Sequence, residues 1–78
     1  MPVIADLGGF KVAMYFEDHN PPHFHVLGPD WRAAFAIADG RLLRGRCPPA
    51  AKKAVKVWVA ENEAVLLEKW IELNERND

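Results

Sequence analysis

The segment that decides the fold runs from residue 18 to residue 26 and reads DHNPPHFHV, with all three histidines of the chain inside it. Its two prolines fix φ and hold the residues before them extended, which predicts a stiff turn that enters a strand. Side chains along a strand alternate between its two faces, so His23 and His25 share one face. Phe24 and Val26 share the other face, and we expect them in a hydrophobic core.

The two imidazoles therefore stand on the surface opposite the core. We expect the Cα atoms of His23 and His25 to lie about 7 Å apart, at ~3.4 Å per residue. This spacing lets both rings converge on one ligand, one phosphate or one metal ion. His19, at the far side of the turn, either joins them or hydrogen-bonds the loop.

Further short segments around this one carry strand signals. Residues 10–17 alternate apolar and polar side chains, and Gly8-Gly9 before them suits a tight turn. Asp39-Gly40 predicts a two-residue hairpin turn. Because the connections are short, we expect an antiparallel meander of four or five strands. The strands are expected at residues 3–7, 10–17, 23–27, 31–37 and 41–44.

Matching of the apolar faces predicts the register of the central strand, because a one-residue slip would turn the core side chains to water. On one side we expect Phe24 opposite Phe35. On the other side we expect Phe24 opposite Phe16 and Val26 opposite Met14.

The face turned away from the core then gathers polar side chains around small ones. In the predicted register Tyr15 lies opposite His25, and Ala34 lies on the other flank of His25. Small residues among larger polar ones predict a shallow depression. The polar members are Lys11, Tyr15, Glu17, His23, His25 and Arg32, and the small members are Ala13, Ala34 and Ala36.

From Pro48-Pro49 onward the hydrophobic period changes from two to 3.6, as in an amphipathic helix. The apolar stripe is interrupted at residues 61–63, where Asn62 suits the N-cap of a second helix. Over residues 49–75 we therefore favour two helices above one long bent helix, packed on the sheet face of Phe10, Phe16, Phe24 and Phe35. The stripe consists of Val55, Trp58, Val59, Leu66, Leu67, Trp70 and Leu73.

The helical segment holds more apolar residues than one face of a small sheet needs. Val57, Val65 and Ile71 fall outside the stripe. Excess apolar surface on so small a protein indicates a partner protein or a homodimer.

Composition narrows the class of protein. The 78 residues suffice for one domain, residues 1–78, and leave no room for a second. The net charge of −1 gives no overall field for nucleic-acid binding, although basic residues cluster between positions 41 and 56. Cys47 is the sole cysteine, which excludes an internal disulfide. Neither a signal peptide nor a membrane-spanning run is visible, so we expect a cytoplasmic protein.

Four segments together resemble a known family. They are the start Met1-Pro2-x-Ile4, Gly8-Gly9-Phe10, residues 18–26, and the tail Glu61-Asn62…Leu66-Leu67…Trp70. The pattern is similar to the small bacterial proteins catalogued as domain of unknown function 4160. Members are often encoded beside a second small protein, catalogued as domain of unknown function 2442, in an arrangement that looks like a toxin–antitoxin pair. The resemblance implies a two-gene module in which this chain binds the partner protein from the adjacent gene.

Paired imidazoles suit general acid–base cleavage of RNA near neutral pH without a metal. His23 and His25 would share the work, one taking the 2′-hydroxyl proton and the other giving a proton to the leaving oxygen. Lys11 or Arg32 would stabilise the charge that develops on the phosphoryl group. Tyr15 completes the candidate set. RNA is thus the candidate substrate, and this chemistry needs no cofactor.

Two other interpretations of the histidines stay open. His19, His23 and His25 could hold zinc, copper or nickel with an open fourth position. In a purely structural role, His19 and His23 hydrogen-bond the turn backbone while His25 stacks on Tyr15. The leading interpretation is a toxin–antitoxin-like component that binds its partner, with RNA cleavage as candidate activity and metal binding as the alternative.

Overall fold

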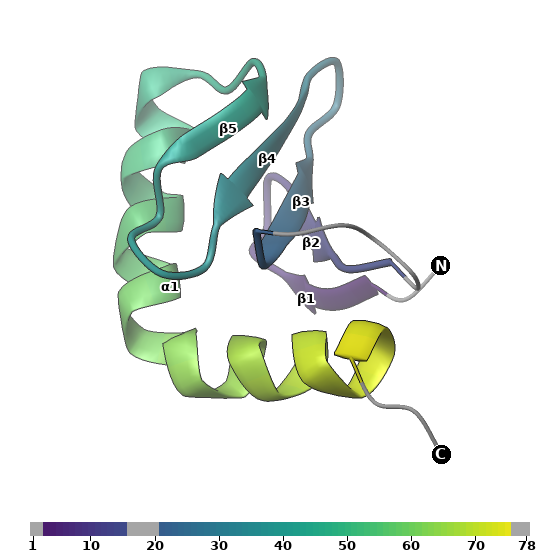
Figure 1. The fold of residues 1–78 in the computed structure, drawn as a ribbon. Coiled ribbons are helices and arrows are strands. Elements are labelled where there is room, and N and C mark those ends of the chain that lie inside the picture. The colour runs from purple at the N-terminus through teal and green to yellow at the C-terminus, as the bar shows by residue number, and fades with distance from the viewer. Residues whose placement is uncertain (1–2, 16–20, 76–78) are drawn as a thin grey trace.

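The computed structural model describes residues 3–15 and 21–75 as one antiparallel sheet followed by one helical segment. Consecutive strands are neighbours in the order β1-β2-β3-β4-β5, so the predicted α+β meander is confirmed (Figure 1). The elements are β1 Val3–Asp6, β2 Lys11–Ala13, β3 His23–Leu27, β4 Arg32–Ala36, β5 Leu42–Gly45, the helix α1 Pro49–Trp70 and the π-helical turn η1 Ile71–Glu75.

The pairing of β3 with β4 has the predicted register. Phe24 lies opposite Phe35, and Val26 lies opposite Ala33. The two phenyl rings stack with their centroids 5.9 Å apart and their planes inclined by 18°. Both rings are fully buried, and aromatic pairs across strands are among the stronger contacts in a sheet. This hairpin therefore anchors the middle of the sheet.

On the other side of β3 the predicted register is wrong by two residues. Val12, rather than Met14, lies opposite Val26, and Ala13 lies opposite His25. The strand β2 also ends four positions earlier than expected. A slip of two residues keeps every side chain on its own face, so matching of apolar faces cannot detect it.

The connection between β4 and β5 is longer than the predicted two-residue turn. The N–H of Ala36 donates to the carbonyl oxygen of Arg41, and the N–H of Gly40 donates to the carbonyl oxygen of Ala36, both at 2.9 Å. These bonds close a loop over residues 37–40. Gly40 adopts φ +71°, a conformation that side chains disfavour, so the glycine is needed even though the turn type differs.

One continuous helix replaces the two helices favoured from the sequence. Asn62 does not cap a new helix; its side-chain Nδ2 donates to the carbonyl oxygen of Trp58 at 2.9 Å within α1. A side-chain donor that enters the backbone hydrogen-bond ladder in this way bends a helix. Figure 1 shows the consequence, because α1 first runs beside β5 and then turns to run below β1 in the view.

The bent helix and one face of the sheet form the core. The helical stripe faces the core as predicted, with Trp58, Leu67 and Leu73 partly buried at its margins. Phe10 packs at the edge of the core, where its ring lies 5.8 Å from that of Trp31, and the predicted core position of Phe16 lies outside the described residues. The core residues are Val12, Met14, Phe24, Val26, Ala33, Phe35 and Ile37 together with Val55, Val59, Leu66 and Trp70 of the helix.

Three apolar side chains of the helical segment stay exposed, as the sequence predicted. The exposed fractions are 58% for Val57, 61% for Val65 and 48% for Ile71. Their use by a partner or a second copy stays a prediction. No helix among residues 3–15 and 21–75 is long and apolar enough to cross a membrane.

Candidate functional site

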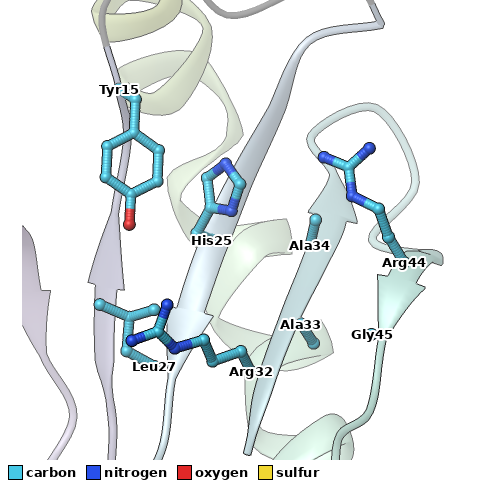
Figure 2. A pocket seen from close by; sticks show the side chains of 8 residues that line it. All are labelled: Tyr15, His25, Leu27, Arg32, Ala33, Ala34, Arg44 and Gly45. Carbon is cyan, nitrogen blue, oxygen red and sulfur yellow. The ribbon is translucent and has the colours of Figure 1, made fainter.

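A shallow depression of about 290 Å³ lies on the face of the sheet turned away from α1 (Figure 2). Its volume is at the lower end of the range for ligand sites, which suits a small chemical group rather than a whole cofactor. None of its lining side chains is acidic. The lining residues are Tyr15, His25, Leu27, Arg32, Ala33, Ala34, Arg44 and Gly45.

The strand register builds this depression. Ala34 lies between His25 on β3 and Arg44 on β5, so a methyl group separates the imidazole from the guanidinium. One step along the sheet, Arg32 lies opposite Leu27. Ala34 is only 2% exposed, which makes it the floor on which the longer side chains stand.

A glycine on β5 brings the two arginines onto one surface. Gly45 adopts φ +86°, and a Cβ atom there would overlap the carbonyl oxygen of Arg32 and lie 2.9 Å from the Cα atom of Ala33. Only glycine therefore lets β5 approach β4 this closely. Arg44, the residue before it, then shares the depression with Arg32.

Both guanidiniums are available to a ligand. Arg32 and Arg44 are exposed, and neither forms an ion pair or hydrogen bond with any side chain in the described part of the chain. Arg41 differs, because it pairs with Asp39 at 3.6 Å. Figure 2 shows Arg32 extended over Leu27, while the guanidinium of Arg44 lies on the other side of the His25 ring.

The imidazole of His25 contacts Tyr15 at one edge of the depression. The ring centroids are 4.5 Å apart and the planes are inclined by 62°, an edge-to-face arrangement. The predicted ring contact is thus confirmed, although Ala13 and not Tyr15 is the strand partner of His25. His25 is half-buried, so part of its ring stays within reach of a ligand.

His23 occupies a different environment from His25, and the prediction that both imidazoles stand on the surface is wrong for His23, which is buried. It is only 2% exposed, and its Nδ1 lies 2.8 Å from the carbonyl oxygen of Pro21. A carbonyl oxygen can only accept, so Nδ1 carries the hydrogen of this bond. The His23 ring lies 5.1 Å from that of His25 and 5.2 Å from that of Trp70, measured between centroids. These contacts match the predicted backbone-bonding role of His23, which does not line the depression.

Comparison with known proteins places the chain in a family. The family model described as "Domain of unknown function (DUF4160)" matches residues 9–71, most of the 78-residue chain. The chain belongs to the DUF4160 family. The matched region contains every residue that lines the depression. No curated protein and no solved structure matches the chain.

The DUF4160 fold brings together part of the candidate set predicted from the sequence. Tyr15, His25 and Arg32 share the depression, whereas Lys11 lies in a neighbouring one. Arg44 was missed. Its signal was available, because alternation along the expected strand at residues 41–44 could have been matched to the neighbouring strand.

The metal site predicted from the sequence consists of His19, His23 and His25. His19 lies outside the residues that the structure of this DUF4160 protein describes. Within those residues no three His, Cys, Asp or Glu side chains lie close enough to hold a metal ion. The three-histidine site for zinc, copper or nickel stays a prediction. If this site exists, calorimetry should detect binding of zinc or nickel to the purified protein, and His25→Ala should abolish that binding.

Proposed function

We propose that this protein is a binding module whose open sheet face holds an anionic group of a larger ligand. The observation that carries the proposal is the pair of exposed guanidiniums, Arg32 and Arg44, on either side of His25. A guanidinium is charged at every physiological pH, and its planar fork of donors matches phosphate and carboxylate oxygens.

The surroundings of the two arginines favour anion binding. Neither guanidinium has to leave an ion partner among the described residues, so binding breaks no existing salt bridge. The small floor at Ala34 and Gly45 leaves the space between the two arginine side chains open to an anion. The half-buried imidazole of His25 adds a directional hydrogen bond, which an open surface of lysines would lack.

The family resemblance supplies a setting for this activity. We propose that the protein is a component of a two-gene, toxin–antitoxin-like module and that it binds the partner protein from the adjacent gene. The exposed Val57, Val65 and Ile71 support a second contact surface on the helix, separate from the depression. Co-purification of both gene products, followed by light scattering, tests the partner and the homodimer together.

Titration with inorganic phosphate tests the binding module directly. We expect the ring-proton NMR signals of His25 to shift on addition of phosphate, and the shift to disappear in the double variant Arg32→Ala, Arg44→Ala. Lys53→Ala is the control, because this exposed lysine lies on α1, on the other side of the sheet. Equal shifts in the double variant and in the control would rule out the proposed site.

RNA cleavage is a second candidate function, and the position of His25 beside two guanidiniums favours it. The His25 imidazole would take the proton of a 2′-hydroxyl, whose oxygen then attacks phosphorus while the bond to the 5′-oxygen breaks. Arg32 and Arg44 would stabilise the charge on the phosphoryl oxygens. The Tyr15 hydroxyl would give its proton to the 5′-oxygen, and the proton held by His25 would then return to the Tyr15 oxygen, directly or through water, which restores both groups. The buried His23 would position His25 rather than exchange protons with RNA.

The products of this reaction provide its test. Purified protein should release fragments that end in a 2′,3′-cyclic phosphate, and a strand with 2′-deoxyribose at the cleaved position should stay intact. His25→Ala should lower the rate by about 10²–10⁴-fold, the usual contribution of a general base. Expression of the His25→Ala variant should then no longer arrest growth. Equal cleavage by wild type and variant would eliminate this function and leave the binding module standing.

A further inference from the structure

A second depression, of about 340 Å³, borders the first on the open face of the sheet. Leu27 lines both of them, so the two depressions adjoin at this side chain. Lys11 and Arg32 both lie opposite Leu27, one from each neighbouring strand. The side chain of Arg32 extends over Leu27 and thus stands at the junction (Figure 2).

The second depression offers different chemistry from the first. Asp6 contributes a carboxylate, whose Oδ1 accepts a hydrogen bond from the Gly8 N–H at 3.0 Å. Lys11 contributes an exposed ammonium, and Phe10 lines the floor beside them. One acceptor and one donor are groups that recognise a nucleoside, through its amino or hydroxyl hydrogens and its acceptor atoms.

The span of the two depressions demands an extended ligand. Lys11 and Arg32 are separated by two strand spacings, which places their Cα atoms about 10 Å apart. One phosphate group held between Arg32 and Arg44 leaves the second depression empty. A ligand that fills both must carry an anionic group and a neutral group with hydrogen-bond donors next to it.

We propose that a single strand of nucleic acid crosses the open face, with a backbone phosphate between Arg32 and Arg44 and the neighbouring nucleoside against Asp6, Lys11 and Phe10. This inference rests on the proposed function, because it takes the anion site as its first contact. An acidic peptide fits less well, since it would bring a carboxylate next to the carboxylate of Asp6. A duplex fits less well, since the hydrogen-bonding edges of its bases are already paired with each other.

Fluorescence anisotropy with labelled strands tests the inference. The ligands are a mononucleotide, RNA and DNA strands of about eight residues, and a glutamate peptide of matched charge. We expect the long strands to bind at least about tenfold more tightly than the mononucleotide. Lys11→Ala should weaken their binding several-fold and lower the slope of log K against log salt by about 0.7. Lys53→Ala, which removes the same charge from α1, should leave affinity and slope unchanged. Comparison of the affinities for RNA and DNA shows whether the ribose 2′-hydroxyl contributes to binding.

The variant Asp6→Asn distinguishes a nucleoside from an anion as the group bound in the second depression. The variant should bind the strands more weakly if the carboxylate accepts hydrogens from a nucleoside. Tighter binding by Asp6→Asn, or equal binding of the peptide and the RNA, would overturn the proposal. Strands that bind no better than the mononucleotide would also overturn it, while a phosphate-induced shift of His25 would keep the binding module intact. Loss of that phosphate shift would instead count against the anion site itself.

Discussion

The imidazole of His23 packs against the indole of Trp70, with the ring centroids 5.2 Å apart. This contact joins the beginning of the central strand to the last residue of α1. Both side chains are almost completely buried, so the contact belongs to the core and not to the surface.

Truncation of Trp70 should destabilise the protein severely. Trp70→Ala removes a large side chain that is 1% exposed, and we expect the free energy of unfolding to fall by about 3–5 kcal/mol in urea titrations. Val65→Ala on the same helix serves as the control, because Val65 is 61% exposed and its loss should change stability by no more than about 0.5 kcal/mol. Similar losses in both variants would mean that Trp70 is not a core residue.

The two histidines of β3 should respond differently to substitution. His23→Ala removes the donor to the Pro21 carbonyl and should lower the free energy of unfolding by about 1–3 kcal/mol. His25→Ala should lower it by less than about 1 kcal/mol but weaken the binding of phosphate. Chemical denaturation and calorimetry measure the two effects separately. A stable His23→Ala variant that no longer cleaves RNA would instead favour the original acid–base pair of imidazoles.

A side chain at Gly45 should damage both the fold and the anion site. Gly45→Ala places a Cβ atom against the Arg32 carbonyl at φ +86°, and the strained backbone alone should cost about 1–3 kcal/mol. Because β5 must then move away from β4, phosphate affinity should fall as well. Gly9→Ala is the matched control, since no atom lies within 4 Å of the added Cβ. Unchanged phosphate affinity in Gly45→Ala would show that strand spacing does not set the site.

The thiol of Cys47 should react slowly with disulfide reagents. Burial raises its pKa above the ordinary value, and the ammonium of Lys52 offsets only part of that effect. The reactive thiolate is therefore scarcer than in an unfolded chain, and the midpoint of the reaction rate against pH should lie above that of free cysteine. Lys52→Ala should move that midpoint higher still. A midpoint below that of free cysteine would contradict the assigned environment.

The raised pKa of Cys47 also makes the free energy of unfolding depend on pH. The folded protein holds the Cys47 proton more tightly than the unfolded chain does, because burial disfavours the thiolate. This contribution is fully present below the unfolded pKa and is lost as pH rises through the folded pKa. Cys47→Ser should therefore show a shallower loss of stability on the alkaline side than the wild type shows.

Sequence patterns determined the faces of the strands better than their offsets. Phe24 and Phe35 were paired correctly because only one pairing of two aromatic residues across a short connection buries both. The partner of Val26 was misplaced by two positions, because Val12 and Met14 are both apolar and both point to the core. The alternation of apolar and polar residues shows which side of the sheet each side chain occupies. It does not reveal a shift of one strand by two residues, because such a shift leaves every side chain on the same side.

The continuous helix and the position of Arg44 in the site were not predicted from the sequence, because both depend on contacts with neighbouring residues in space. Asn62 resembles a cap, yet its amide satisfies the Trp58 carbonyl inside a continuous helix, a choice that depends on packing at both ends. Arg44 was read as part of a general basic cluster, whereas its position opposite Ala34 depends on the close approach permitted by Gly45. Residue types alone do not disclose such spatial neighbours.

The continuity of α1 makes the chain a single cooperative unit. The turns after Asn62 supply Leu66 and Trp70 to the same core that Val55 and Val59 enter from the first turns. A protease that cut within this helix would remove part of the helical side of the hydrophobic core. The remaining hairpins would then be unable to stay folded. Native digestion should consequently yield intact protein or small peptides, with no trimmed intermediate that survives.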